Sequence, residues 1–304
     1  MLEKEMNQMA LDLLDSQSFA SAQRLFFQNA LKHPCHQTYN NLGVFLFTEG
    51  FTCFRKKTFS GHKFGLYFLR KASALKESQI NLCAIAKAYD DSLLRVAQHK
   101  RSQIYRSAFE CLDRARQLEH SNIITYNYLR SKYLLGIKDD SLSVEAEKLL
   151  GKYLCTESAS LYFGLLQLNA NLNGSLACIK RYREYLSDVD LLMFYSKFGL
   201  YGKGYELCAT VVNDYFPDGN IFSAVTECCV NSSHHEELSA FSTQIFEIVN
   251  DIGTPSYKKK LSAELCELKH SAEKRKELIR CYLPSVPFVD LCYYFGCETH
   301  NTPW

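Results

Sequence analysis

The chain has 304 residues, of which 47% are hydrophobic, and its formal net charge at pH 7 is +2. A charge so close to zero gives no electrostatic reason to expect nucleic acid or an anionic membrane as a partner. With only six prolines and 14 glycines, long disordered or all-β segments are not expected. The length exceeds that of a usual single domain, but an elongated repeat array is compatible with it, because each repeat packs only on its neighbours.

The 13 cysteines are an odd number and are scattered singly, apart from Cys228-Cys229. Several of them, such as Cys83 and Cys208, fall at apolar helical positions, where a free cysteine behaves as a small hydrophobic side chain. The first residues lack the basic and apolar regions of a signal peptide. No apolar stretch approaches the roughly 18 residues that span a bilayer. We therefore expect a cytoplasmic protein with reduced cysteines and without a membrane partner.

The clearest periodic pattern occupies residues 22–50. Small and large apolar residues recur three and four positions apart, stop at Pro34, and resume in the run Tyr39-x₂-Leu42-Gly43-x₂-Leu46. This spacing predicts an amphipathic helix, a short turn and a second amphipathic helix. Residues 2–15 show the same spacing and predict a helix that precedes the pair.

A second copy of the pattern occupies residues 108–133, where Ala108-x₃-Leu112-x₂-Ala115 is followed by Tyr126-x₂-Leu129-x₃-Tyr133. The two copies have nearly the same phase, because Ala108 precedes Tyr126 by 18 residues and Ala22 precedes Tyr39 by 17. Both copies resemble the tetratricopeptide repeat, a helix–turn–helix unit of about 34 residues. The resemblance implies an all-α fold: a right-handed superhelical solenoid of antiparallel helix hairpins, with about 14–16 helices.

We expect this solenoid to cover residues 1–283, with the resemblance clearest over 20–155. Further apolar stripes predict helices up to residue 282, and 257–282 is expected to be the longest. Pro284 and Pro287 then introduce a last segment, 284–304. We expect this segment to be either a cap over the last helix or a docking tail for another protein, with Trp304 covering apolar surface or anchoring the partner.

In tetratricopeptide proteins the first helices of the units line a concave face that binds extended peptides. The resemblance places these partner-binding side chains in that groove: Asn40, Asn41, Phe47, Asn81, Asn127, Tyr128 and Ser131. An asparagine suits this role because its carboxamide offers both donors and an acceptor to a peptide unit. The alternative is that these are ordinary polar residues of an exposed helix face. Lys87 and Arg130 are the nearest basic candidates for a carboxylate clamp, but neither is at the clamp position of the motif.

Other candidate sites have stronger alternatives. The basic clusters at 55–63, 100–106, 258–260 and 274–276 are interpreted as solvated surface. Four potential zinc ligands occur near the C-terminus, Cys281, Cys292, Cys297 and His300, but they lack a C-x₂-C pair and enclose aromatic residues that suggest packing. We therefore expect no metal and no cofactor. The run His234-His235-Glu236-Glu237 is interpreted as the start of a helix.

The sequence lacks the nucleotide-binding, zinc-protease and serine-hydrolase motifs. We therefore expect a protein that is not an enzyme and has no catalytic residues. The favoured function is a scaffold or adaptor that binds a peptide or protein segment on its concave face. The alternatives are a subunit that presents a substrate to, or regulates, a separate enzyme, and a regulator that senses a peptide. A homodimer formed through one end of the array is a further hypothesis.

Overall fold

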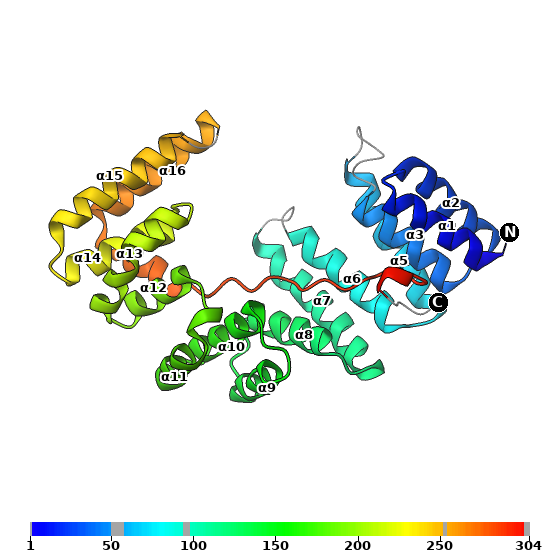
Figure 1. The fold of residues 1–304 in the computed structure, drawn as a ribbon, viewed down its shortest axis with the longest axis horizontal. Helices are drawn as coiled ribbons and strands as arrows, with labels where there is room; N and C mark the ends of the chain where they lie inside the picture. The colour runs from blue at the N-terminus through cyan, green and yellow to red at the C-terminus, as the bar shows by residue number, and fades with distance from the viewer. Residues whose placement is uncertain (1, 50–57, 94–97, 252–253, 301–304) are drawn as a thin grey trace. The chain divides into compact units, whose positions relative to one another are not determined.

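The computed structural model describes residues 2–49, 58–93, 98–251 and 254–300 (Figure 1). These residues contain 16 α-helices and no strand, so the prediction of an all-α fold is confirmed. The chain divides into two compact units. Unit 1 combines residues 1–154 with the C-terminal residues 286–304, and unit 2 comprises residues 155–285. None of the described helices is both long enough and apolar enough to cross a membrane.

In unit 1 each helix packs chiefly on the next helix in the sequence. The helices are α1 (Glu3–Asp15), α2 (Phe19–Lys32), α3 (His36–Thr48), α5 (Thr58–Leu75), α6 (Gln79–Ser92), α7 (Gln98–Leu118), α8 (Asn122–Leu134) and α9 (Asp140–Leu150). The predicted apolar positions form the core, and Leu42, Leu112 and Leu129 are all buried.

Local signals in the sequence account for several helix boundaries in unit 1. Ser78 precedes α6 and accepts a hydrogen bond from the backbone N–H of Asn81, and Asp139 does the same for Ser141 at the start of α9. Such caps satisfy backbone donors that have no partner inside the helix. After α8 the chain reverses at Gly136, whose φ of 69° lies in the left-handed region that favours glycine.

Unit 2 has a different arrangement, because several helices pack around α14 instead of only on their sequence neighbours. Its helices are α10 (Thr156–Leu168), α11 (Leu172–Tyr182), α12 (Asp188–Lys197), α13 (Tyr201–Asp214), α14 (Gly219–Asn231), α15 (His235–Asp251), α16 (Pro255–His270) and α17 (Ala272–Cys281). Helix α14 contacts α12, α13, α15, α16 and α17, and its buried residues, including Phe222 and Cys228, form the centre of the core.

The stretch expected to form one helix over 257–282 forms two. Helix α16 ends at His270 and α17 begins at Ala272, with Ser271 between them. The Ser271 hydroxyl accepts a hydrogen bond from the backbone N–H of Lys274 and caps the second helix. Because the apolar spacing continues on both sides, the periodic pattern alone does not reveal this break.

After α17 the chain is anchored to unit 2 at Tyr282. The Tyr282 hydroxyl donates to the Asp190 carboxylate at 2.6 Å, and the Lys197 ammonium donates to the Tyr282 carbonyl at 3.2 Å. From residue 282 to 293 the chain has no regular secondary structure. We call residues 286–300 the C-terminal segment, and they belong to unit 1.

Two glycines allow α3 and α5 to cross closely. A Cβ atom added to Gly43 would lie 2.9 Å from both the backbone nitrogen and the Cγ of Leu69. A Cβ atom added to Gly65 would lie 2.8 Å from the Gly43 carbonyl oxygen. Since backbone atoms set these limits, a side chain at either position would force the helices apart.

Gly43→Ala is therefore expected to lower the free energy of unfolding of unit 1 by about 1–3 kcal/mol, the usual cost of overpacking. The matched control is Gly202→Ala in α13, where the added Cβ would meet nothing within 4 Å. This control gains helix propensity and should stabilise by up to about 1 kcal/mol. Urea unfolding followed by circular dichroism measures both. Equal effects of the two substitutions would contradict the close-crossing interpretation.

Candidate functional site

A row of buried amide side chains lines one side of the helices of unit 1. We call it the asparagine face and define it by Asn7 on α1, Asn40 and Asn41 on α3, Asn81 on α6, and Asn127 on α8. All five side chains are at most 2% exposed. Polar groups this deeply buried are costly unless they are hydrogen-bonded, and the C-terminal segment supplies most of the partners. In Figure 1 this segment is an extended, irregular stretch of chain that passes α8 and α6 and ends near α3.

The end of the C-terminal segment is held by Asn41 through a two-way contact. The Asn41 amide nitrogen donates to the Phe295 carbonyl at 2.9 Å, and the Phe295 backbone N–H donates to the Asn41 oxygen at 2.7 Å. Asn7 donates to the same carbonyl at 2.8 Å, and Asn41 also donates to the Asn7 oxygen. Both backbone polar groups of Phe295 are therefore satisfied by asparagine side chains.

Asn127 makes the same kind of contact nearer the start of the segment. Its amide nitrogen donates to the Val289 carbonyl at 2.8 Å, and its oxygen accepts the Val289 N–H at 3.0 Å. Between these two anchors, Asn40 donates to the Tyr293 carbonyl at 2.7 Å. Three of the predicted asparagines thus form hydrogen bonds with backbone groups of an extended peptide, and that peptide is part of the same chain.

Two further residues of α8 hold the beginning of the segment. The Arg130 Nε donates to the Val286 carbonyl at 2.7 Å, and the Tyr126 hydroxyl donates to the Pro287 carbonyl at 2.8 Å. The guanidinium of Arg130 also forms an ion pair with Asp90 of α6 at 2.7 Å. Asp90 thereby fixes the direction of the Arg130 fork, so that its Nε is left to face the segment.

The side chains of the segment also have defined neighbours. The Phe288 ring lies 5.5 Å from both the Lys87 ammonium and the Arg130 guanidinium, within the range of cation–π attraction. The Tyr294 ring stacks on Phe26 with centroids 5.8 Å apart, and it packs against the core formed by α1, α2 and α3. The Phe295 ring meets that of His36 edge to face.

Lys87 links the asparagine face to an acidic residue of the segment. Its ammonium lies 3.4 Å from the Asp290 carboxylate and 3.0 Å from Asp91. Burial alone would lower the pKa of Lys87, but the hydrogen bonds and charges of Asp91 and Asp290 outweigh it and raise the pKa. Lys87 is therefore charged at neutral pH. Because the Asp290 side chain is 56% exposed, this ion pair contributes more to recognition than to stability.

The other predicted groove residues that the structure describes contact residues outside the C-terminal segment. Asn81 donates to Asn40 and to the Leu69 carbonyl, so it reaches the segment only through Asn40. Ser131 donates to the Asn127 carbonyl one turn back in its own helix. Phe47 lies against His62 and the backbone at Gly65, where α3 crosses α5. Tyr128 packs with Phe109 and Arg116 of α7. Trp304 lies outside the described residues.

Sequence reasoning did not identify Asn7 or Tyr126 as contacts of the segment. Asn7 lies on a helix without a recognisable repeat motif, and Tyr126 occupies a repeat position that the pattern predicts to be in the core. Tyr126 is fully buried, but its hydroxyl reaches the segment, which the apolar pattern cannot reveal. The sequence suggests Arg130 and Lys87 only as candidates for a clamp on a C-terminal carboxylate. In the structure they contact a backbone carbonyl, the Phe288 ring and the Asp290 side chain.

The structure also describes parts of the other candidate sites from the sequence. The run at 234–237 begins α15 and places Glu236 and Glu237 in its first turn, as predicted. Among the potential zinc ligands, Cys292, Cys297 and His300 come together, whereas Cys281 ends α17 in unit 2. Arg55, Lys56 and Lys57 of the cluster at 55–63 lie outside the described residues. In the cluster at 274–276, Lys274 is paired with Glu267.

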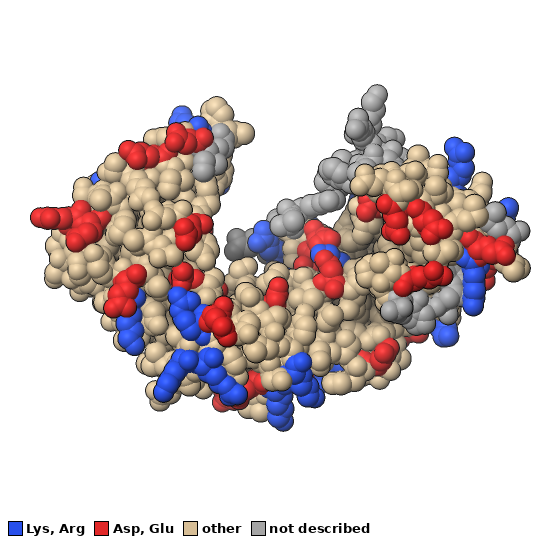
Figure 2. Space-filling view, viewed as in Figure 1, with Lys and Arg blue, Asp and Glu red and all other residues tan. Residues whose placement is uncertain are grey.

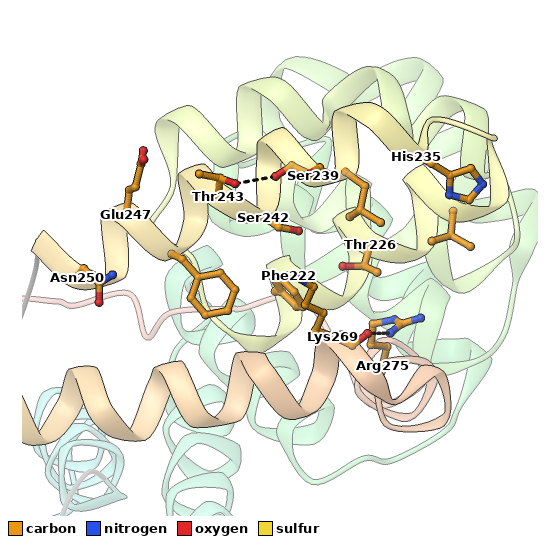
Figure 3. Close-up of a pocket in the computed structure, with 13 residues that line it drawn as sticks. Phe222, Thr226, His235, Ser239, Ser242, Thr243, Glu247, Asn250, Lys269 and Arg275 are labelled. Carbon is orange, nitrogen blue, oxygen red and sulfur yellow. Dashed lines mark hydrogen bonds between the residues drawn. The ribbon is translucent and has the colours of Figure 1, made fainter.

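Unit 2 contains a cavity of about 540 Å³ between α14, α15 and the junction of α16 with α17 (Figure 3). Phe222 and Phe246 are among its apolar lining residues, and Lys269 lies beside Arg275. Arg275 is already engaged, because its Nε donates to Glu227 at 2.8 Å and its terminal nitrogen donates to backbone carbonyls. The other lining residues are a mixture of apolar, hydroxyl and charged side chains, and the charged ones include Lys269 and Glu247.

Comparison of the sequence with protein-family models and with curated proteins finds no match.

The buried pair of Arg130 and Asp90 provides a test of how the face is organised. Arg130→Met should lower the stability of unit 1 by about 3 kcal/mol, because it leaves the Asp90 charge unpaired and the Val286 carbonyl without its donor. Adding Asp90→Asn should restore part of this loss by removing the charge. Urea unfolding provides the measurement.

The matched control is Arg114→Met, which breaks the pair with Glu77 on the surface, where the two side chains are 54% and 35% exposed. This change should cost less than about 1 kcal/mol. If the single and double variants of the buried pair are equally destabilised, the proposed role of Asp90 is wrong.

Proposed function

We propose that the protein is a non-catalytic scaffold or adaptor that binds an extended segment of a partner protein on the asparagine face. Its own C-terminal segment occupies this face until a partner segment replaces it. The observation that carries the proposal is the pair of two-way contacts, Asn41 with Phe295 and Asn127 with Val289. In each contact one carboxamide satisfies both backbone groups of one residue, which is the way that a neighbouring β-strand would.

Such contacts recognise the peptide backbone rather than a particular side chain. Any extended segment with compatible side chains can therefore make the same hydrogen bonds. From Val289 to Phe295 an extended chain covers roughly 20 Å at about 3.3 Å per residue. A partner segment would need at least this length without internal secondary structure.

Specificity would come from the side-chain contacts that the C-terminal segment now makes. Phe288 lies near two cations, Asp290 pairs with Lys87, and the rings of Tyr294 and Phe295 meet those of Phe26 and His36. We therefore propose a partner segment with an aromatic residue, an acidic residue two positions later, and an aromatic pair four positions after that. Net charge contributes little, and both signs occur on each unit in the face drawn in Figure 2.

We further propose that the helix pairs form a right-handed superhelical array of the tetratricopeptide type. Three observations support this in unit 1: the helices pack in sequence order, Gly43 lies at a close helix crossing, and the asparagines recur on one side of successive pairs.

The decisive test asks whether the C-terminal segment can exchange. A site for a specific protease is inserted after Ser285, an exposed residue between the Tyr282 anchor and the segment. Cleavage leaves the segment in place without a covalent link. A fluorescent synthetic peptide of residues 286–300 should then replace it, as measured by anisotropy. Peptides with Asp290→Lys or Tyr294→Ala should bind more weakly.

Asn41→Ala should weaken peptide binding by roughly tenfold or more, because it leaves the Phe295 N–H without a partner, at about 1–3 kcal/mol, and removes one of the two donors to the Phe295 carbonyl. The matched control is Asn29→Ala in α2. Asn29 is also buried in unit 1, but its amide donates to the Glu3 carbonyl and not to the segment. This control should change peptide affinity less than about threefold. A segment that never exchanges would show a purely structural role and overturn the proposal.

A further inference from the structure

Three metal-ligating side chains come together at the end of the C-terminal segment. The two sulfur atoms of Cys292 and Cys297 and a ring nitrogen of His300 all lie within 4.8 Å of one another. The Cys297 sulfur lies 3.2 Å from His300 Nδ1. Among the described residues this is the one group of three or more cysteine, histidine or acidic side chains with such close ligand atoms.

The backbone explains why these residues meet. Gly296 adopts a φ of 73°, which reverses the chain directly after Phe295 and returns Cys297 toward Cys292. A 3-10 turn at Glu298–His300 then brings the imidazole back to Cys297. In the middle of this hook, Asn41 holds both backbone groups of Phe295. The arrangement is therefore fixed by contacts outside the three ligands.

We propose that Cys292, Cys297 and His300 bind a zinc ion. Zinc favours thiolate and imidazole ligands in a tetrahedral arrangement, with bonds of about 2.3 Å to sulfur and about 2.0 Å to nitrogen. Those bond lengths place the ligand atoms roughly 3.5–3.8 Å apart, so small side-chain rotations within the present hook suffice. On binding, the two thiols release their protons, and two thiolates, a neutral imidazole and Zn²⁺ give a complex with no net charge.

The fourth coordination position is left to water or another small ligand. Cys281, the remaining candidate from the sequence, is an exposed residue at the end of α17 and is not in the group. The ligand spacing is thus C-x₄-C-x₂-H, without the paired knuckle of a zinc finger. The site joins two points of the chain on either side of Phe295.

Zinc would therefore close the hook around the anchored Phe295 and slow the release of the C-terminal segment. This consequence rests on the proposed peptide exchange, whereas zinc binding does not. The experiment is designed so that the two can fail separately.

Metal-free full-length protein is prepared with a chelator and a non-thiol reductant and is then titrated with Zn²⁺ and, separately, Co²⁺. One equivalent of zinc should bind. Cobalt should give the thiolate charge-transfer and visible d–d absorption of a tetrahedral site. His300→Ala, a change at an exposed residue, should lower zinc affinity by more than roughly tenfold. Cys297→Ser should lower it likewise and should weaken the charge-transfer band, to which only the Cys292 thiolate then contributes.

Cys266→Ser and Cys281→Ser remove exposed thiols of unit 2 and are the matched controls; both should bind zinc as the unaltered protein does. Any of three results would overturn the site. These are loss of zinc in either control, unchanged zinc affinity in the His300 and Cys297 variants, and a Cys292–Cys297 disulfide in place of metal binding. In the cleaved protein, zinc should slow peptide exchange at least about tenfold. If zinc binds stoichiometrically but does not slow peptide exchange, the zinc site is supported and its control over exchange is rejected. If the peptide never exchanges, with or without zinc, the proposed function is rejected.

Discussion

The structure of unit 1 depends on one constraint: buried carboxamides must find hydrogen-bonding partners. Asn41 and Asn127 each offer a donor and an acceptor on the same side of a helix. Backbone N–H groups in the interior of neighbouring helices cannot donate to the two side-chain oxygens, because they are already paired within their own helices. An extended chain has its N–H and C=O groups free, and residues 286–295 supply both. The asparagine face and the irregular conformation of the C-terminal segment thus require each other.

This requirement joins the two ends of the chain. Asn7 and Phe295 are hydrogen-bonded across a sequence separation of 288 residues, and Tyr294 packs into the core of the first three helices. Helix pairs such as α2 and α3 form from local contacts, whereas the asparagine face can be completed only when the last residues arrive. Bringing together parts of the chain so far apart in sequence has a large entropic cost. Many backbone contacts of the segment must form together to offset this cost, so we expect the whole segment to dock at once.

The sequence predicted more of the helices than of the site. Apolar spacing revealed the helix pairs because the core positions of α3 and α8 follow the 3.6-residue period. The motif also placed Asn40, Asn41 and Asn127 near an extended peptide. It could not separate these from Phe47 and Tyr128, because each helix contacts neighbours on two sides and the motif does not say which side a flanking residue faces. Nor could it show that the peptide belongs to the same chain, since docking within a chain and between chains uses the same hydrogen bonds.

Tethering determines how such a face would select a partner. If a partner segment exchanges with residues 286–300 as proposed, the partner competes with a segment of the same chain, whose covalent attachment raises its effective concentration. A free partner with the same contacts would therefore compete poorly at ordinary protein concentrations. It would need better side-chain contacts at the sites of Phe288 and Tyr294, or a weakening of the hook at Cys292, Cys297 and His300. Asn41 and Asn127 would recognise the backbone of both competitors in the same way. Selectivity must therefore come from the side-chain contacts at the sites of Phe288 and Tyr294 and from the hook at Cys292, Cys297 and His300.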